Sequence, residues 1–428
     1  MGISKRIVFA TFGSLGDLHP ALAVAIGLKA RGHCPVIASH GVYREKVESE
    51  GIAFHVVPPD ITDLGEETEV ARRAFDPADG PRYLIADYFL PRFAQTYAAT
   101  DAAAKNADLI VTHPGIFAGH LVAEKRALPW LSVALAPTSF FSAHDPAVLA
   151  PVPYFHLLQP ALGPATFAKL MRVVQRIPSL WTAPVTAFRA EIGLPPTDRE
   201  PLFDGQWSPQ GSLAMFHPVL GTPQPDWPVH TTQTGFAFYD KRDAGDALPP
   251  EIAAFLDAGD PPIVFTLGSA AVMTAGTFYR ESAAAAQRLG RRAILLTGRD
   301  ARNVPASLPS GVAAFPYAPY GELFARCAAV VHQGGVGTTG QVLRAGVPQV
   351  VVPFGFDQPD NAMRVVRAGV ARTLTRGSYR ADTAERALRE LLTHESYREN
   401  AARVGESVRA QDGIGAACDV IEAMLRGR

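Results

Sequence analysis

The sequence has little cysteine, no excess of charge of either sign and no long apolar run. Its three cysteines, Cys34, Cys327 and Cys418, are far apart and match no metal-binding spacing, which indicates free thiols in a reducing compartment. The 40 Lys and Arg residues stand against 41 Asp and Glu residues, which argues against nucleic acid as the main partner. No stretch approaches about 18 uninterrupted apolar residues, so we expect no membrane span and predict a cytoplasmic protein.

The apolar content is sufficient for two hydrophobic cores. The chain has 428 residues, of which 47% are hydrophobic and 19% charged. Strand-like apolar runs alternate with helical stretches near both ends of the chain, a pattern typical of parallel sheets with crossover helices. We therefore predict an α/β protein with two Rossmann-like domains, residues 1–222 and 223–410, that face each other across a cleft. A C-terminal helix over 411–428 is expected to pack back toward the first domain.

The middle of the chain is the hardest part to interpret. Residues 140–227 are rich in proline and aromatic residues and lack clean periodicity. We expect helices and loops here that cover the mouth of the first sheet and leave room for an apolar partner. The segment Gly221–Pro228 is the predicted interdomain linker. No polybasic helix supports membrane association in this region, although peripheral association through exposed apolar residues stays open.

The most informative motif is a glycine-rich loop between a strand and a helix, A-V-V-H-Q-G-G-V-G-T-T-G, in residues 329–340. Glycines allow a tight turn and bring backbone amides close to a ligand, and a helix start favours an anion, typically phosphate. A dinucleotide fingerprint is disfavoured because no acidic residue closes the next strand. The alternative is a tight connection without a ligand. The candidate phosphate-binding residues are His332, Gly334, Gly335, Gly337, Thr338 and Thr339.

Three neighbouring segments are expected at the same edge of this sheet. Asp357 and Gln358 suit the hydroxyl groups of a sugar, although Asp357 alone would as readily cap the helix that follows. Tyr317 could stack on a base while the backbone near Ala318 reads the base edge, or it could be a half-buried aromatic on a turn. A further phosphate donor is expected after the first strand of this domain, at Gly268 and Ser269.

These residues resemble nucleotide-sugar-dependent glycosyltransferases of the GT-B architecture, which glycosylate small lipophilic molecules. The resemblance covers essentially the whole chain and is strongest at Phe12–Pro20 and Tyr317–Asn361. It is closest to bacterial members with a G-S-x-G-D-x-x-P loop, including transferases for glycopeptide antibiotics, sterols and rhamnolipid precursors. It implies an inverting hexosyl transfer from a nucleotide diphosphate sugar, without a metal or cofactor. UDP-glucose is the default donor, and UDP or TDP with a deoxysugar stays open.

The resemblance also implies roles for particular residues of the second domain. The glycine loop would hold the diphosphate, Tyr317 the base, and Asp357 with Gln358 the sugar. The ribose-binding glutamate of many relatives is replaced here by Gln341. Close relatives often carry a second histidine where this chain has Gln333, so either His332 or Gln333 could make the main phosphate contact.

The first-domain loop, Gly13–Pro20, carries the candidate base, with Ser14 assigned to the donor side. In the resembling subgroup the position of Asp17 holds the catalytic aspartate. A helix is expected to open at Pro20, and Asp17 could merely cap it. His19, with an ordinary pKa better matched to neutral pH, is the alternative base.

In relatives that resemble this chain but use a histidine base, an acidic partner follows a later first-domain strand. That neighbourhood holds Thr112 and His113 without a carboxylate, so a His–Asp pair is not expected. His113, Phe140 and Phe141 are instead candidates for lining the acceptor pocket. The alternative functions are a sugar-nucleotide epimerase or hydrolase of the same fold, and a non-catalytic sugar-nucleotide binding protein.

Overall fold

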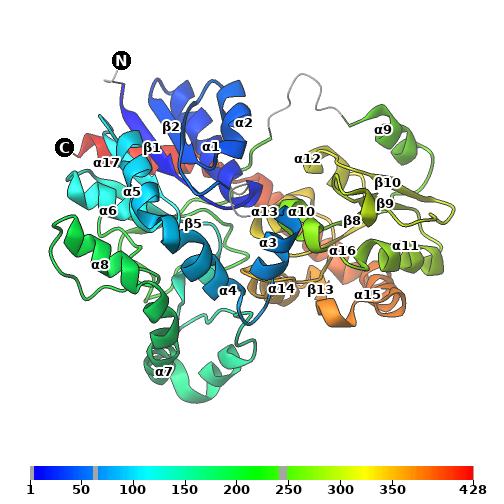
Figure 1. Cartoon of the computed structure of the whole chain (residues 1–428). Coiled ribbons are helices and arrows are strands. Elements are labelled where there is room, and N and C mark those ends of the chain that lie inside the picture. Colours follow the sequence, from blue (N-terminus) through cyan, green and yellow to red (C-terminus); the bar gives the residue numbers. More distant parts are fainter. Residues whose placement is uncertain (1–3, 61–65, 241–247, 428) are drawn as a thin grey trace. The chain divides into compact units, whose positions relative to one another are not determined.

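The computed structural model describes residues 4–60, 66–240 and 248–427 and divides the chain into two compact units. Unit 1 comprises Met1–Tyr239 with Asp412–Arg428, and unit 2 comprises Asp240–Gln411. Each unit is built on a parallel β-sheet with helices packed on it (Figure 1). The predicted α/β class with two parallel-sheet domains is confirmed. No helix in the described ranges is both long and apolar enough to cross a membrane.

Unit 1 contains a seven-stranded sheet in the order β3-β2-β1-β4-β5-β6-β7, in which all neighbours are parallel. Its strands are β1 Arg6–Ala10, β2 Cys34–Ser39, β3 Ala53–Val56, β4 Leu109–Thr112, β5 Trp130–Ala134, β6 Ser212–Ala214 and β7 Thr231–Gln233. Its described α-helices are α1 Leu15–Ala30, α2 Arg44–Ser49, α3 Glu67–Ala74, α4 Gly80–Arg82, α5 Phe93–Ala103, α6 Phe117–Lys125, α7 Gln159–Trp181, α8 Ala183–Glu191 and α17 Gly413–Arg426. The central strands β1, β4 and β5 are buried along almost their whole length because helices cover both faces of the sheet.

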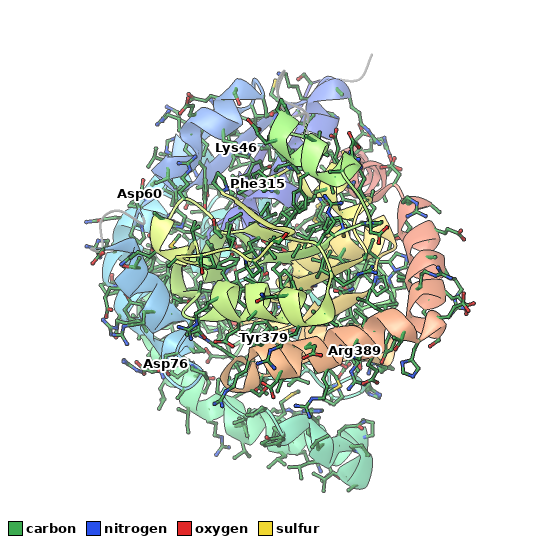
Figure 2. All side chains as sticks on the ribbon, turned by 90° about the vertical axis from the view of Figure 1, so that its right-hand side faces the viewer. Lys46, Asp60, Asp76, Phe315, Tyr379 and Arg389 are labelled. Carbon is green, nitrogen blue, oxygen red and sulfur yellow. The ribbon has the colours of Figure 1, made fainter. Side chains whose placement is uncertain are left out.

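Unit 2 contains a six-stranded parallel sheet in the order β10-β9-β8-β11-β12-β13. Its strands are β8 Ile263–Thr266, β9 Ala293–Leu296, β10 Val312–Phe315, β11 Ala329–His332, β12 Gln349–Val351 and β13 Ala371–Thr373. Its described α-helices are α9 Pro250–Asp257, α10 Gly268–Ala271, α11 Phe278–Leu289, α12 Tyr320–Phe324, α13 Val336–Ala345, α14 Gln358–Arg367, α15 Ala381–Thr393 and α16 Glu395–Arg409. In Figure 2, Tyr379 lies against α11, where its ring stacks on Phe278, whereas Arg389 lies on the outside of α15.

In both sheets the direction in which the chain adds strands reverses after the third strand. In unit 1 the chain adds β2 and β3 on one side of β1 and then adds β4 on its other side. In unit 2 it adds β9 and β10 on one side of β8 and then adds β11 on the other. Loops that leave the carboxyl ends of two such strands diverge to opposite faces and leave a crevice, which is where open α/β sheets bind ligands. The loops after β1 and β4, and those after β8 and β11, are therefore the places to look for a site.

Helix α1 begins earlier than predicted. It starts at Leu15, not at Pro20, because Ser14 and Asp17 form a capping box. The Ser14 hydroxyl accepts from Gly16 N–H at 3.1 Å, and the Asp17 carboxylate accepts from the Ser14 N–H. Pro20 consequently lies inside the helix. The satisfied backbone donors of the first turn set the helix start, and the proline is accommodated within it.

The predicted domain boundary at 222/223 falls inside unit 1. The proline-rich segment 221–228 is anchored because the Trp227 ring packs against Phe140, with ring centroids 4.4 Å apart. Strand β7 then pairs with β6, and the chain leaves unit 1 only after Tyr239. The C-terminal helix packs on the first domain as predicted: α17 lies against α1, where Gly27 leaves room for the Ile414 side chain.

Candidate active site

Asp17 is held at the carboxyl end of β1 by its own loop. Its Oδ2 accepts hydrogen bonds from the Ser14 N–H at 2.7 Å and from the Ser14 hydroxyl at 3.2 Å. Gly13 has a φ of +114°, and a Cβ at this position would collide with the Asp17 carboxylate, so only glycine fits. The Tyr43 hydroxyl donates to the Gly13 carbonyl at 2.8 Å. These contacts use one carboxylate oxygen for the fold and leave Oδ1 to face outward from the loop.

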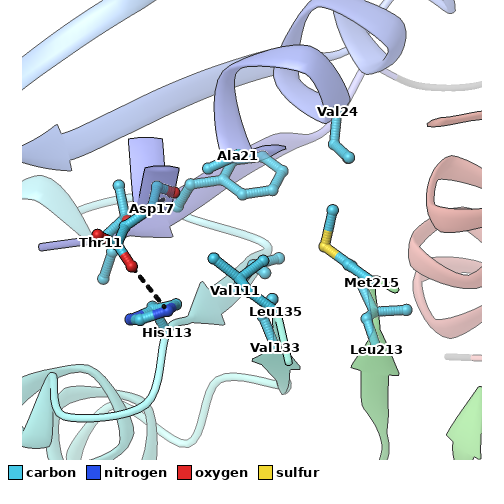
Figure 3. A pocket seen from close by; sticks show the side chains of 12 residues that line it. Thr11, Asp17, Ala21, Val24, Val111, His113, Val133, Leu135, Leu213 and Met215 are labelled. Atoms are coloured by element: carbon cyan, nitrogen blue, oxygen red, sulfur yellow. Dashed lines mark hydrogen bonds and ion pairs between the residues drawn. The ribbon is translucent and has the colours of Figure 1, made fainter. Parts of the chain in front are cut away.

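The other Asp17 oxygen faces His113, which follows β4. The Asp17 Oδ1 and His113 Nε2 atoms lie 3.5 Å apart, as the dashed line in Figure 3 shows. The His113 N–H donates to the Ala10 carbonyl at 3.1 Å, which fixes its backbone beside β1. The expectation that no His–Asp pair forms is therefore wrong. The expectation placed an acid after the later strand, whereas the structure has the acid after β1 and the histidine after β4.

Burial sets the charge state of this pair. The two side chains are 29% and 20% exposed, so neither is fully solvated. Burial lowers the pKa of His113 below its ordinary value, although the Asp17 charge and the Pro114 backbone act in the opposite direction. The imidazole is thus neutral at neutral pH. A carboxylate beside a neutral imidazole can take a proton from a hydroxyl group and share it with the ring.

An apolar pocket begins at this pair (Figure 3). Asp17, His113 and Thr11 are its polar members, and its walls come from α1 and from β1, β4, β5 and the segments around β6. The apolar lining residues are Phe9, Ala10, Ala21, Val24, Val111, Val133, Leu135, Leu213 and Met215. Walls of this kind exclude water and strengthen the electrostatic interactions of the polar groups at the mouth.

His19 is not among the residues that line this pocket. Its ring lies 4.9 Å from the Tyr239 ring, measured between centroids, and its Nε2 is buried without a hydrogen-bond partner in the described part of the chain. Burial, together with the charge of Lys46, lowers the pKa of His19 to about 4. A ring with this pKa is a weak base at neutral pH, so the alternative assignment of His19 as the base does not fit the structure.

The two phenylalanines predicted for the acceptor pocket lie elsewhere in unit 1. Phe140 is buried, and its ring packs against Trp207, Phe216 and Trp227. Phe141 adopts a left-handed backbone conformation with a φ of 48° and packs edge-on against Phe203. Neither lines the pocket at Asp17. The structure therefore gives Phe140 a role in the aromatic core, in place of the predicted contact with an acceptor.

His332 supports the glycine loop from behind. It is fully buried at the end of β11. Its Nδ1 accepts from the Gly334 N–H at 3.1 Å, so Nε2 carries the proton and donates to Gln349 Oε1 at 2.7 Å. Burial lowers the pKa of His332 to about 4. Because both ring nitrogens are engaged, the prediction that His332 donates to a phosphate does not fit this geometry.

Gln333 lies where the loops after β8 and β11 meet. Its Nε2 is 3.5 Å from the Thr338 hydroxyl, and its Oε1 is buried without a partner among the described residues. Gly268 has a φ of +65°, and a Cβ on it would collide with the Gln333 amide. Ser269 follows Gly268 at the start of α10. The structure thus brings these four predicted residues together, and Gln333, unlike His332, keeps a side-chain atom without a partner among the described residues.

Asp357 caps α13 and not α14, the helix that directly follows it. It directly precedes α14, but its side chain makes no cap contact there. Its Oδ2 instead accepts from the Val336 N–H of α13 at 3.2 Å and from the Asn361 side-chain amide at 2.6 Å. The Gln358 Oε1 accepts from the Phe354 and Gly355 N–H groups at 2.7 and 3.1 Å. Asp357 therefore already lies beside the start of α13, next to the glycine loop.

The remaining residues predicted for the donor site differ in solvent exposure. Gly335 and Gly337 are accessible, whereas the Thr339 hydroxyl is fully buried and therefore does not point toward a ligand. Tyr317 is 64% exposed, whereas Ala318 next to it is buried. The Gln341 Oε1 accepts from the Arg344 guanidinium at 2.8 Å.

Sequence reasoning missed two residues that hold this loop. Gln349 fixes the tautomer of His332, and the Asn361 amide donates to the Gly334 carbonyl at 2.9 Å. A buried glutamine in an otherwise apolar strand, V-P-Q-V-V, was the available signal for the first. Across residues 4–60, 66–240 and 248–427, no three His, Cys, Asp or Glu side chains are grouped so as to hold a metal ion. The absence of a metal requirement stays a prediction.

Comparison with known families accounts for both halves of this arrangement. Residues 7–139 match the glycosyltransferase family 28 N-terminal domain, and residues 283–419 match the erythromycin biosynthesis protein CIII-like C-terminal domain. The chain is 33% identical over 435 residues to the O-mycaminosyltylonolide 6-deoxyallosyltransferase of Streptomyces fradiae, covering 99% of this chain and 98% of that one. It is 28% identical over 442 residues to the sterol 3-beta-glucosyltransferase of Aspergillus terreus, with 98% of this chain but 30% of that protein covered.

Solved structures share the fold. The glycotransferase of kitacinnamycin superimposes with a TM-score of 0.72 at 21% identity, with 99% of each chain covered. The glycosyltransferase VinC in complex with dTDP gives a TM-score of 0.68 at 19% identity, with 98% of this chain and all of that one covered. The two parallel sheets thus have the arrangement within each domain that the GT-B fold has. The chain belongs to the GT-B glycosyltransferases, in the family that includes enzymes of antibiotic and sterol glycosylation.

Proposed function

We propose that the protein is an inverting glycosyltransferase that moves a hexosyl group from a nucleotide diphosphate sugar to a hydroxyl group of a small lipophilic acceptor, with Asp17 as the general base. The observation that carries this proposal is the split use of the Asp17 carboxylate. One oxygen is bound to Ser14 and fixes the side chain, while the other faces His113 at the mouth of the apolar pocket. A sugar-nucleotide binding protein without activity has no need of such a base.

The reaction is a single displacement. The acceptor oxygen forms a bond to the anomeric carbon as its proton passes to Asp17 Oδ1. The bond between the anomeric carbon and the diphosphate oxygen breaks, and its electron pair leaves with the diphosphate. Attack from the opposite face turns an α-linked donor into a β-linked product. Because Oδ2 is committed to the loop, the base acts through fixed placement.

Unit 2 supplies the charge stabilisation for the leaving group. Gly335, which is partly exposed, and Gly337, which is exposed, lie at the start of α13, where the helix dipole favours an anion. The Gln333 amide and the Thr338 hydroxyl lie beside them. These groups support binding of the diphosphate without a metal. Asp357, with its carboxylate at the same place, and Gln358 are proposed to hold the sugar, and Tyr317 the base.

The donor and the acceptor are proposed by class. UDP-glucose is the first donor to test. The name of the Streptomyces fradiae relative specifies a 6-deoxyallosyl group, and VinC was solved with dTDP, which supports a TDP-linked 6-deoxyhexose as the next donor. The apolar residues around Asp17 support a lipophilic acceptor group next to the base, although their cavity, about 20 Å³, has no room for a whole acceptor. The two relatives are named for O-mycaminosyltylonolide and for sterols, which supports polycyclic or macrocyclic alcohols.

The test is product formation by the wild-type chain beside Asp17→Asn. Each protein is incubated with UDP-glucose, TDP-glucose and a TDP-6-deoxyhexose, with a panel of macrocyclic, steroidal and phenolic alcohols, with and without a chelator. Mass spectrometry detects the transferred sugar, and proton NMR coupling constants give the anomeric configuration. We expect a β-linked product from the wild type, a loss of about 100- to 10,000-fold in kcat for Asp17→Asn, and no effect of the chelator.

Nucleotide binding serves as the control for this experiment. Calorimetric titration with UDP and TDP should give the same affinity for the wild type and for Asp17→Asn, because Asp17 belongs to unit 1 and the nucleotide-binding loop to unit 2. An α-linked product would contradict the single displacement. Sugar release without transfer to any acceptor would favour a hydrolase, and equal turnover by both proteins would remove Asp17 from the role of base.

A further inference from the structure

The outer face of α7 carries an apolar row beside a basic row. The apolar row consists of Val173, Ile177 and Leu180, whose side chains are 54%, 67% and 74% exposed. The basic row consists of the exposed residues Lys169, Arg172 and Arg176. We refer to these six residues as the α7 face. Four further exposed apolar residues precede it in the chain: Tyr154, Leu157, Leu158 and Leu162.

The two rows run parallel because of the helical period. Residues of the apolar row are spaced i, i+4 and i+7, and residues of the basic row are spaced i, i+3 and i+7, so each set follows one side of a helix with 3.6 residues per turn. The opposite side of α7 attaches it to unit 1. There Phe167 is fully buried and its ring lies 4.9 Å from the Phe155 ring. In Figure 1, α7 lies at the lower end of unit 1 in the view shown.

In the part of the chain that the structure describes, no acidic group pairs with the basic row. Residues 146–190 contain no Asp or Glu, although the whole chain is nearly neutral. Among the described residues, no ion pair involves Lys169, Arg172 or Arg176. The fourth cation of this segment, Arg189, is buried and pairs with Glu124 at 2.7 Å. The α7 face therefore combines exposed apolar area with a local positive charge.

We propose that the α7 face docks unit 1 on an anionic lipid surface. Apolar side chains enter the boundary between headgroups and acyl chains, and cations beside them meet lipid phosphates, as in other interfacial helices. Lys and Arg have stems long enough to lie along apolar neighbours while their charged ends reach the headgroups. A second copy of the chain fits less well, since a two-fold contact through the same face brings its cations together with no acid in the segment to pair them.

The sequence did not reveal this face, and the proposal departs from the expectation that no polybasic helix supports membrane association. Three basic residues over eight positions do not stand out in a chain with a net charge of −1. Only the burial of Phe167 shows which side of α7 points outward. The inference concerns a surface of unit 1 and does not depend on the identity of the donor or acceptor.

Vesicle flotation with the full chain tests the proposal. The probes are vesicles of phosphatidylcholine alone and of phosphatidylcholine mixed with phosphatidylglycerol. We expect binding to the mixed vesicles only, weakened by salt. The triple variant Lys169→Glu, Arg172→Glu and Arg176→Glu should bind roughly 100-fold less tightly, since each cation near an anionic surface contributes about fivefold. The triple variant Val173→Ser, Ile177→Ser and Leu180→Ser should lose binding as well.

Matched variants keep the test specific. Arg386→Glu, Arg398→Glu and Arg403→Glu make the same change of charge at exposed positions of unit 2 and should bind vesicles like the wild type. Circular dichroism establishes that each variant is folded. No binding of the wild type to either vesicle, or equal loss in the control variant, would overturn the proposal. A dimer in light scattering that Ile177→Ser dissociates, with no vesicle binding, would assign the face to a second copy instead.

Discussion

The two units place different chemistry at the same point of the same topology. In unit 1 the loops after β1 and β4 bring together a carboxylate and an imidazole, Asp17 and His113. In unit 2 the loops after β8 and β11 bring together Gly268 and the amide of Gln333. The first pair can move a proton, and the second lies among backbone amides that suit an anion. The strand order determines where a site forms, and the side chains determine what it does.

The two sites also differ in how their side chains are held. In unit 2 the polar side chains bind the backbone of the site itself: His332 accepts from Gly334 N–H, Asn361 donates to the Gly334 carbonyl and Gln358 accepts from Phe354 N–H. In unit 1 one carboxylate oxygen binds Ser14 and the other faces His113. We therefore expect substitutions around the glycine loop of unit 2 to change stability and nucleotide binding together, and substitution of His113 in unit 1 to change turnover without changing nucleotide binding.

The largest expected difference between the units is in their stability at acidic pH. Burial lowers the pKa of His19 and His40 to about 4 and that of His120 to about 3, all in unit 1, whereas unit 2 contains one such group, His332, at about 4. In the unfolded chain these histidines have the ordinary pKa of 6.5, so below that pH they bind protons that the same histidines do not bind in the folded chain. The free energy of unfolding thus falls as pH drops from 6.5 toward 4, by roughly 3 kcal/mol for each of these groups at most.

Pulse proteolysis with mass spectrometry of the fragments measures this difference. At about pH 5 we expect peptides of unit 1 to be released before those of unit 2, with a smaller difference at about pH 7. The variant His120→Phe removes one of the titrating groups and keeps a ring beside Trp130, so it should lose less stability on acidification. Release of unit 2 peptides first at about pH 5 would contradict the prediction that acid destabilises unit 1 more than unit 2.

A methyl group on Gly334 should disable the nucleotide site. Gly334 has a φ of +90°, and an added Cβ would lie 2.6 Å from the Val351 side chain and 3.1 Å from the Gln358 carbonyl. We expect Gly334→Ala to destabilise unit 2 by about 2–4 kcal/mol and to weaken nucleotide binding at least tenfold. Urea unfolding and calorimetric titration with UDP or TDP check both effects. Gly377→Ala, where an added Cβ meets nothing, is the matched control.

Removal of the imidazole beside Asp17 should slow turnover without affecting nucleotide binding. His113→Asn removes a partner of a charged group, which corresponds to a loss of about 10- to 100-fold in kcat. Because the pKa of His113 is lowered by burial, the acid side of the pH profile of kcat should also change. A rise in the acceptor KM alone would instead support the prediction from sequence that His113 lines the acceptor pocket.

The smallest effect is expected at Tyr317. Stacking of a base on an aromatic ring contributes about 1–3 kcal/mol, so Tyr317→Ala should weaken nucleotide binding about tenfold and Tyr317→Phe should preserve it. Tyr154→Ala removes a comparably exposed tyrosine from unit 1 and should leave nucleotide affinity unchanged. An effect of Tyr154→Ala equal to that of Tyr317→Ala would show that the measurement does not isolate the base.

The fold was predictable where strands are long enough to show a pattern. The strands that carry the site loops, β1, β4, β8 and β11, were all anticipated from short apolar runs. Strands β6, β7 and β13 were missed because each is short and contains polar residues (S-L-A, T-T-Q and A-R-T), so none forms an apolar run. The start of α1 was misplaced because Pro20 was given more weight than the Ser14–Asp17 capping box.

The sequence by itself determined the class of protein and the positions of its chemical groups. A glycine loop between a strand and a helix, and an aspartate on the first loop, are local patterns that depend on neighbouring residues only. Tertiary structure alone decided the contacts of those groups. The Asp17–His113 pair arises because β4 adds beside β1, and the hydrogen bond of His332 to Gln349 arises because β12 adds beside β11. Such contacts depend on which strands become neighbours, and the packing of the whole sheet sets that order.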